Sequence, residues 1–139
     1  MIEQLQPRTL QFDASDGWQL EGDLYEGPNP TIAVVISAGT GFPRRFYHQL
    51  ATYLAAQGAV VLTYDYRGIG GSGAQNLAAS NIDYPDWGRF DTPAAVDALE
   101  RLSPNLPITH VAHSVGGHFI GLMPNHEKIA RHAFVSIGT

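Results

Sequence analysis

The sequence has 139 residues, a net charge of −5 and 44% hydrophobic residues, which fits one globular domain over residues 1–139 and excludes a disordered chain. It contains no cysteine, which excludes a disulfide scaffold, a cysteine-ligated zinc site and a thiol nucleophile. Thirteen acidic against eight basic residues disfavour a nucleic-acid partner, and the absence of a long apolar run or a secretory signal predicts a cytoplasmic protein without a membrane span.

The chain opens with an alternating apolar pattern and continues with buried strands separated by helical patterns. Thr9–Asp13 and Trp18–Tyr25, separated by the turn residues Ser15–Gly17, predict an antiparallel hairpin. Four apolar, largely β-branched runs predict strands buried on both faces of a sheet: Thr31–Ser37, Ala59–Tyr64, Ile108–Ala112 and Ala133–Ile137. The helical patterns predict Phe46–Gln57, a helix that starts at Asp86, Asp91 or Thr92 and runs to about Leu102, and Val115–Leu122.

Buried strands that alternate with helices are typical of a mostly parallel sheet with helices on both faces. The N-terminal antiparallel hairpin then lies at one edge of that sheet. We therefore predict an α/β fold with six strands in this chain.

The most informative stretch is the turn that leads from the strand Ile108–Ala112 into the helix after it. Residues Ala112–Gly116 follow the pattern small-x-Ser-x-Gly, although alanine stands where glycine is common. A sharp strand-to-helix turn leaves no room for side chains two positions before and after the serine, and it pushes the serine hydroxyl clear of the sheet. Ser114 is therefore a candidate nucleophile, and the alternative is a serine that only caps the helix.

Three blocks, in this order, resemble the N-terminal part of an α/β-hydrolase, in particular the serine aminopeptidase and monoglyceride-lipase-like branch. They are Ser37–Pro43 after the third strand, Asp65–Ser72 after the fourth, and the turn around Ser114. The resemblance covers residues from about 9 to 139. It implies a serine hydrolase that acts on a carboxylic ester, thioester or amide through an acyl-enzyme, with a small-molecule acyl substrate and no cofactor.

In enzymes of this kind the first block forms the oxyanion loop. The resemblance places one backbone N–H donor at Thr40 and the other at Val115, the residue after the nucleophile. The second block forms a structural loop in this superfamily, so we expect Arg67 to bind carbonyl groups or to pair with an acid. Asp65 precedes the serine in the chain and is not expected to be the acid of the triad.

The general base and its acid are expected after the nucleophile, in the order serine, acid, histidine. The acidic and histidine side chains after Ser114 do not stand where relatives carry those groups: His118, His126, Glu127 and His132. We therefore expect the acid and the base to be absent from this chain, which would hold six of the usual eight strands and show little turnover.

The resemblance also implies the strand order 1-2-4-3-5-6, which makes Ala133–Ile137 an uncovered edge strand. A missing C-terminal helix is expected to leave an apolar patch over Ala33, Val35 and the helix Phe46–Gln57. Both features predict self-association, or pairing with a second chain that supplies the remaining strands.

The histidines do not predict a metal site. No pair of them has the i, i+4 spacing of a helical zinc site, and no acidic partner is near. His113 is next to Ser114 in the sequence, but adjacent side chains of such a turn point apart. We therefore expect His113 to have a structural or pocket-lining role.

Two other functions remain open. Gly39–Gly41 lies between a strand and a helix, and Asp65 follows the next strand, which is also typical of a dinucleotide-binding domain. Against this function, Arg44 stands where a third small residue is needed and Pro43 interrupts the start of the helix. The second alternative is a non-catalytic binding or assembly module with a hydrolase-like half-fold, which the missing acid and base favour.

Overall fold

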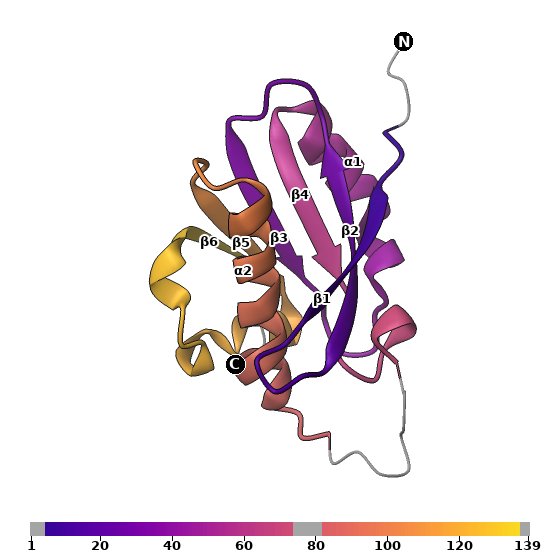
Figure 1. The fold of residues 1–139 in the computed structure, drawn as a ribbon, viewed down its shortest axis with the longest axis vertical. Coiled ribbons are helices and arrows are strands. Elements are labelled where there is room, and N and C mark those ends of the chain that lie inside the picture. Colours follow the sequence, from indigo (N-terminus) through magenta and orange to yellow (C-terminus); the bar gives the residue numbers. More distant parts are fainter. Residues whose placement is uncertain (1–4, 74–81, 137–139) are drawn as a thin grey trace.

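A six-stranded mixed sheet forms the centre of the computed structural model, which describes residues 5–73 and 82–136 (Figure 1). The strand order β1-β2-β4-β3-β5-β6 confirms the predicted order. In chain order the strands are β1 (Arg8–Asp13), β2 (Gln19–Glu26), β3 (Ile32–Ser37), β4 (Ala59–Tyr64), β5 (Ile108–His113) and β6 (Ile129–Val135). Strands β3 to β6 are parallel, so their carboxyl ends lie at the same end of the sheet.

Strands β1 and β2 form the predicted antiparallel hairpin at one edge. Its turn contains Gly17, whose φ of +93° is a backbone conformation that glycine adopts without steric cost. Phe12 pairs with Leu20, and both side chains are buried, whereas their sequence neighbours on each strand are more exposed. This alternation of buried and exposed side chains is the pattern from which the sequence predicts the hairpin.

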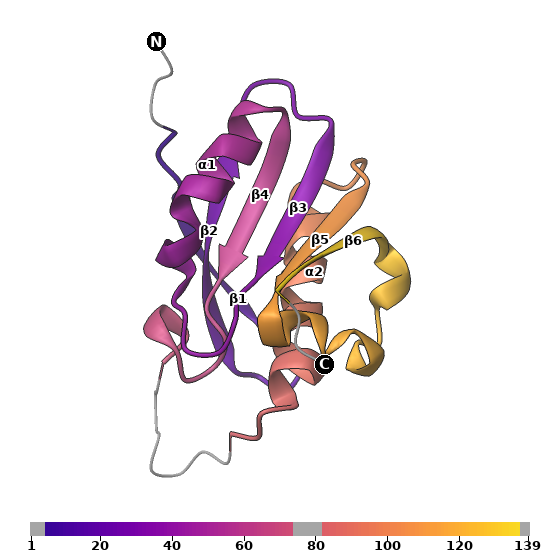
Figure 2. The same ribbon diagram turned by 180° about the vertical axis from the view of Figure 1, so that it is seen from behind.

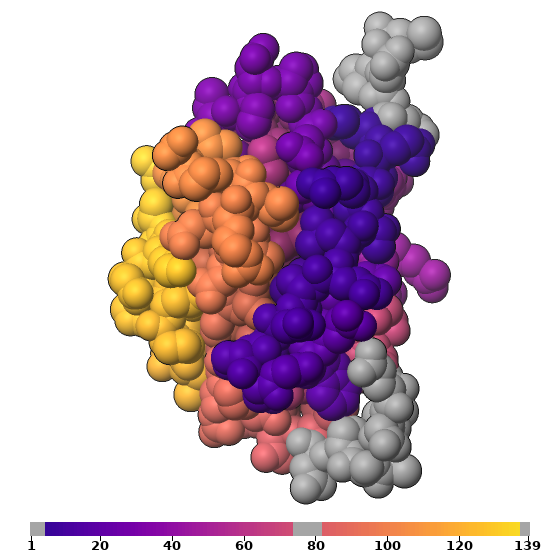
Figure 3. Space-filling view, in the orientation of Figure 1, coloured from indigo at the N-terminus to yellow at the C-terminus, as the bar shows by residue number. Residues whose placement is uncertain are grey.

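One helix covers each face of the sheet, which is why every residue of β4 is buried. Helix α1 (His48–Ala56) packs on one face and helix α2 (Thr92–Leu102) on the other (Figures 1 and 2). On the face with α2, this helix lies between the indigo hairpin and the yellow C-terminal segment (Figure 3). Within the part of the chain that the structure describes, no helix is long and apolar enough to cross a membrane.

Both helices begin with tighter or wider turns than a regular α-helix. The predicted helix Phe46–Gln57 starts as a 3-10 turn, η1 (Arg44–Tyr47), and continues as α1. A π-helical turn, η3 (Trp87–Asp91), leads into α2, so Thr92 is the predicted start that the structure shows. Proline is tolerated in the first turn of α2 because a backbone N–H there has no partner within the helix.

The predicted helix Val115–Leu122 is wrong. This segment forms two short 3-10 turns instead, η4 (Ser114–Gly117) and η5 (Ile120–Leu122). Three of its eight residues are glycine, and each glycine disfavours a helix by about 1 kcal/mol relative to alanine.

The predicted bounds of the last strand are also wrong, because β6 begins four residues before Ala133 and ends at Val135. The predicted end, Ile137, lies outside the described residues. As the edge strand, β6 exposes most of its residues, so its first half carries charged and polar side chains and lacks the apolar run of a buried strand. A 3-10 turn, η6 (His126–Lys128), precedes it.

The apolar patch that was predicted over Ala33 and Val35 is not formed by these residues, and the open apolar surface lies on the other face of the sheet, beside α1. Ala33 and Val35 are fully buried, because they share with Ser37 the face of β3 that packs under α2. On the other face, α1 stops short of β5 and β6 (Figure 2). A hollow of about 320 Å³ is open there. Its lining comprises Ile36, Phe46, Tyr47, Gln49, Leu50, Val111, His113 and Val135.

Candidate active site

Ser114 lies at the sharp turn that ends β5. Its φ of +53° is a left-handed conformation, which is uncommon for residues other than glycine and costs about 1–3 kcal/mol. The turn η4 starts at this residue, and Ser114 is half-buried. The chain thus holds Ser114 in the strained turn that the sequence pattern predicts.

Small residues flank Ser114 because the turn leaves no space for larger ones. Ala112 is completely buried. A Cβ atom added at Gly116 would lie 3.0 Å from both the Cβ atom and the carbonyl oxygen of Ser37 on β3. Ser136 also has a positive φ, of +52°, but it is exposed beyond the end of β6. Ser114 therefore differs from Ser136 in that its turn, besides having a positive φ, packs closely on β3.

The loop between β3 and α1 lies against Ser114. A Cβ atom added at Gly39 would lie 3.3 Å from the Cβ atom of Ser114 and 3.2 Å from Nδ1 of His113. Glycine at this position lets the loop backbone approach the serine closely. The structure therefore brings the predicted oxyanion loop and the predicted nucleophile together.

The two predicted backbone donors lie in different surroundings. Thr40 is exposed, and its Oγ1 atom is 3.1 Å from the hydroxyl oxygen of Tyr84, which comes from the segment before α2. Val115 is buried directly after the nucleophile. Thr40 lies in the loop after β3, and Val115 lies in the turn that starts at Ser114. Their role as oxyanion donors stays a prediction.

Two tyrosine hydroxyl groups hold the first residues of the loop. The hydroxyl of Tyr66, just after β4, donates a hydrogen bond of 2.9 Å to the carbonyl oxygen of Ala38. The hydroxyl of Tyr47 accepts a hydrogen bond of 2.9 Å from the backbone N–H of Gly39. Both tyrosines are buried, so these bonds are shielded from water and fix the start of the loop on β4 and on the turn before α1.

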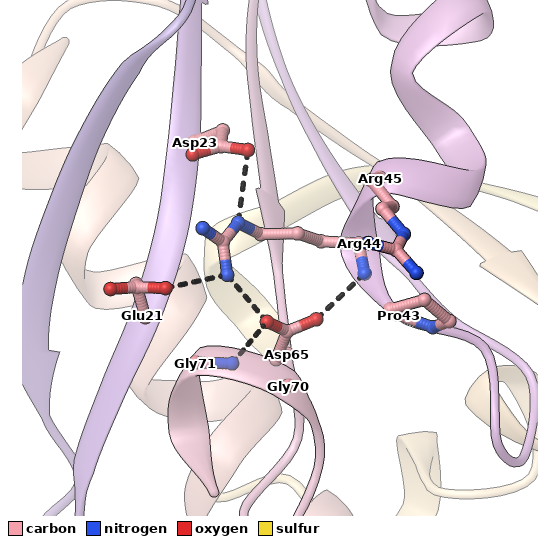
Figure 4. Close-up of a pocket in the computed structure, with 8 residues that line it drawn as sticks. All are labelled: Glu21, Asp23, Pro43, Arg44, Arg45, Asp65, Gly70 and Gly71. Atoms are coloured by element: carbon pink, nitrogen blue, oxygen red, sulfur yellow. Dashed lines mark hydrogen bonds and ion pairs between the residues drawn. The ribbon is translucent and has the colours of Figure 1, made fainter.

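A buried carboxylate holds the other end of the loop (Figure 4). Asp65 accepts hydrogen bonds from the backbone N–H of Arg44 at 2.6 Å and from that of Gly71 at 3.0 Å. The Arg44 guanidinium also pairs with Asp65, and it contacts Glu21 at 2.8 Å and Asp23 at 2.9 Å on β2. Burial lowers the pKa of Arg44, but the carboxylates of Asp23 and Asp65 raise it by more, so this guanidinium stays charged.

This arrangement argues against the dinucleotide-binding alternative. Asp65 is 1% exposed, and its carboxylate is fully engaged by Arg44 and Gly71. A ribose-binding carboxylate must instead be free to accept hydrogen bonds from the cofactor. Asp65 has the structural role that the second sequence block predicts.

Arg67 pairs with acids, as predicted. Its guanidinium contacts Asp91 at 2.8 Å and Asp16 at 2.6 Å, and its backbone N–H donates to Asp91 at 2.8 Å. The rings of Trp18 and Phe90 each lie 5.2 Å from its central carbon. Burial raises the pKa of Asp91 to about 6, even though the hydrogen bonds from Arg67 lower it. This cluster joins the hairpin turn to the start of α2.

His113 has the pocket-lining position that was expected. Its Nδ1 atom is 2.7 Å from the hydroxyl oxygen of Tyr47. Its ring is parallel to that of Phe46 at 6.4 Å and tilted against that of Phe42 at 5.5 Å. These contacts direct the ring toward the turn η1 and into the hollow beside α1.

His110 is fully buried beneath the same turn, on the face with α2. Its Nε2 atom is 2.7 Å from Oγ of Ser37, and its Nδ1 atom is 3.2 Å from Nδ1 of His132. Burial lowers the pKa of His110 to about 4, so the ring is neutral near pH 7. Among the described residues, no group of three or more histidine, aspartate or glutamate side chains is arranged to hold a metal ion.

These contacts leave the general base of Ser114 unassigned. His110 uses both ring nitrogens, and His113 uses Nδ1 on Tyr47. The turn η6, with His126 and Glu127, lies at the amino end of β6, whereas Ser114 follows the carboxyl end of the parallel strand β5. The two side chains of η6 are therefore at the far end of the sheet from the nucleophile.

Sequence reasoning missed the part that Tyr47 plays at this site. The sequence predicts Tyr47 only as a residue of the helix Phe46–Gln57 and assigns it no role at the site. In the structure its ring is buried, and its hydroxyl binds Gly39 and His113. A tyrosine at a core position, next to a glycine-rich loop, is the signal that points to such a role.

The comparisons with known proteins agree with this architecture. Residues 28–137 match the family model described as "Serine aminopeptidase, S33". No match was found among curated proteins.

Solved structures with the same fold include the α/β-hydrolase GrgF from Penicillium sp. sh18, with a TM-score of 0.78 and 22% identity over 94% of this chain and 45% of that chain. A hypothetical protein from Pseudomonas aeruginosa has a TM-score of 0.78 and 25% identity over 96% of this chain and 43% of that chain. A thermostable carboxyl esterase from Bacillus coagulans has a TM-score of 0.78 and 20% identity over 94% of this chain and 44% of that chain.

The chain thus spans less than half the length of each of these structures. The family model, however, covers most of the chain, including the loop after β3, the loop after β4 and the turn at Ser114. The chain therefore belongs to the serine aminopeptidase family of the α/β-hydrolase superfamily.

Proposed function

We propose that Ser114 is the nucleophile of a serine hydrolase that acts on a carboxylic ester, thioester or amide. The observation that supports this most directly is the position of Ser114, with a φ of +53° at the carboxyl end of a parallel strand and Gly39 packed against its Cβ atom. In α/β sheets, ligands bind at the carboxyl ends of the strands. Membership of a hydrolase family supports the same chemistry.

In the proposed reaction, Oγ of Ser114 attacks the carbonyl carbon of the substrate and gives up its proton to water. The carbonyl oxygen becomes an oxyanion and accepts hydrogen bonds from the backbone N–H groups of Thr40 and Val115. The bond to the leaving alcohol, thiol or amine then breaks, and the leaving group departs with a proton. Water hydrolyses the resulting acyl ester on Ser114.

Because no base is assigned to Ser114, we expect slow acylation with little turnover, and covalent capture is the suitable assay. An oxyanion site without a complete triad still accelerates the reaction by about 10³–10⁴ over water. A fluorophosphonate probe should therefore add one label to the 15.0 kDa chain in an intact-mass spectrum. The variant Ser114→Ala should show no label.

The matched control is Ser136→Ala, which removes another serine with a positive φ beyond the end of a strand. This variant should label at the rate of the unmodified chain. An unlabelled chain that is folded by circular dichroism, or a label that persists in Ser114→Ala, would contradict the proposed nucleophile.

The exposed edge of the sheet favours assembly as a second candidate function. In the described chain, β6 pairs only with β5 and exposes Phe134 and Val135. A sheet edge presents unpaired backbone groups to which another strand can bind. We propose that a second copy of this chain pairs there, along the exposed end of β6 that contains Phe134 and Val135.

This pairing predicts a dimer in sedimentation velocity at micromolar concentration. Val135→Lys should weaken the dimer at least about tenfold, since a charge on an edge strand opposes strand pairing. Tyr53→Lys, which changes an exposed side chain on α1, should leave the dimer intact. A monomer at all concentrations would exclude pairing between copies.

A further inference from the structure

The hydroxyl group of Tyr47 lies between the loop after β3 and the residue that precedes the nucleophile. It is 2.9 Å from the backbone nitrogen of Gly39 and 2.7 Å from Nδ1 of His113. Tyr47 is 6% exposed, so its side chain is buried, whereas His113 is half-buried and lines the hollow beside α1.

The direction of the bond with Gly39 follows from the chemistry of its two groups. The N–H of Gly39 can only donate, so the tyrosine oxygen accepts this bond. The hydroxyl of Tyr47 and Nδ1 of His113 form the second hydrogen bond, and its donor depends on the tautomer of His113. Burial raises the pKa of Tyr47, although the bond from Gly39 lowers it, so the hydroxyl keeps its proton.

The surrounding rings fix the position of this hydroxyl. The ring of Tyr47 meets that of His113 edge to face at 5.8 Å and that of Phe46 at 5.1 Å. Phe46 in turn contacts Phe42 of the loop at 4.5 Å. The rings of Phe42, Phe46, Tyr47 and His113 form one aromatic cluster on the side of the turn away from α2. The hydroxyl of Tyr47 therefore has little freedom to leave its two partners.

The two partners lie next to the groups of the proposed oxyanion site. Gly39 directly precedes Thr40, and His113 directly precedes Ser114. The Gly39 Cβ position lies only 3.3 Å from the Cβ atom of Ser114, so a small shift of the loop changes the distance between the nucleophile and its N–H donors. Oxyanion stabilisation depends steeply on such distances, because the donors must lie about 2.7–3.1 Å from the oxyanion.

We propose that Tyr47 is a positioning residue, which holds the oxyanion loop at a fixed distance from Ser114 through two hydrogen bonds of its hydroxyl, one from Gly39 N–H and one with Nδ1 of His113. This inference rests on the proposed function of Ser114. Tyr47 itself touches neither substrate nor reacting atoms. It acts through the backbone on both sides of the site.

The test is Tyr47→Phe, which keeps the ring in the aromatic cluster and removes only the hydroxyl. The rate of fluorophosphonate labelling at Ser114 should fall about tenfold, less than the roughly 10²–10³ lost with an oxyanion donor itself. The amide of Gly39 should exchange with solvent faster. The ¹⁵N resonance of His113 Nδ1 should shift, since the nitrogen loses its hydrogen-bond partner.

The chain offers a matched control in Tyr25→Phe. Tyr25 is also buried, and its hydroxyl is 2.9 Å from Nδ1 of His48. This variant removes the same kind of tyrosine–histidine bond on β2 and α1, away from the loop. Labelling of Ser114 and the Gly39 and His113 signals should not change in it.

The outcomes separate this inference from the proposed function. If the unmodified chain labels and Tyr47→Phe labels at the same rate, Tyr47 is not a positioning residue. If the unmodified chain does not label at all, the proposed function fails, and the magnetic-resonance signals decide the position of the loop. Unchanged Gly39 exchange and an unchanged His113 resonance in Tyr47→Phe then overturn the inference. Equal losses in Tyr25→Phe also overturn it, because they indicate a general loss of stability.

Discussion

Replacing Arg67 by methionine should lower the free energy of unfolding by about 3–5 kcal/mol, the usual cost of breaking a buried ion pair. Asp91 is fully buried and would lose its partner, whereas Asp16 lies nearer the surface and can be solvated. The variant also loses the packing of the guanidinium between Trp18 and Phe90. Urea denaturation of the variant and the unmodified chain measures the difference.

This loss should depend on pH, and its sign follows from Asp91. In the folded chain the pKa of Asp91 is already raised from 3.8 to about 6. Without Arg67 it rises further, so the folded variant keeps a proton that the unfolded chain releases. Its free energy of unfolding therefore falls as the pH increases through that range. We expect the variant to be destabilised more near pH 8 than near pH 5.

Two controls test the cause of the effect. Arg67→Met combined with Asp91→Asn removes the orphaned charge and should recover part of the stability and lose the pH dependence. Arg8→Met breaks an exposed pair of 3.7 Å with Glu26 and should have little effect. An Arg67→Met variant as stable as Arg8→Met would show that the cluster does not stabilise the fold.

Replacing Gly88 by alanine should destabilise the chain by about 1–3 kcal/mol, since it overpacks a closed interface. A Cβ atom at Gly88 would lie 2.2 Å from Cβ of Phe119 and 2.6 Å from its Cγ atom. Phe119 is 4% exposed and packs edge to face against Tyr84 and Trp87, so it cannot rotate away. To make room for the added methyl group, the turn η3 and the segment that carries Phe119 must therefore move apart. Urea denaturation gives the size of the loss.

Gly121→Ala is the matched control, because a Cβ atom there would meet nothing within 4 Å. Gly121 lies two residues after Phe119, so both substitutions affect the same contact region of the chain. Alanine at this position should be neutral or slightly stabilising, since it restricts the unfolded chain. Equal losses at both positions would mean that the contact with Phe119 is not the cause.

The sheet could be predicted from the sequence because its strands carry strong local patterns. The run Ala59–Tyr64 is apolar throughout, and every residue of β4 is buried as a result. The hairpin alternates, and one side of it faces the core. By contrast, β6 lies at the edge, where burial does not select apolar residues, and its first half carried no signal.

The sharp turn at Ser114 could be predicted because its requirements are local. Ala112, Ser114 and Gly116 are close in the sequence, and the turn itself dictates their sizes. The prediction of a regular helix after this turn was wrong. The segment has the apolar spacing of a helix, but its three glycines disfavour one.

The contacts that hold the site together could not be predicted in the same way. Tyr47 and His113 are 66 residues apart, and Arg67 and Asp16 are 51 residues apart. Neither pairing follows from spacing or composition, since each depends on how the strands are ordered in the sheet.

The bonds around the loop after β3 also imply an order of assembly. The bond from Gly39 to Tyr47 spans 8 residues, that from Arg44 to Asp65 spans 21 and that from Tyr66 to Ala38 spans 28. The bond from Tyr47 to His113 spans 66. Contacts between near residues close with less loss of chain entropy, so the segment from β3 to β4 can shape the loop before β5 joins the sheet. During synthesis from the N-terminus, the receiving half of the site would then be formed before Ser114 has been added to the chain.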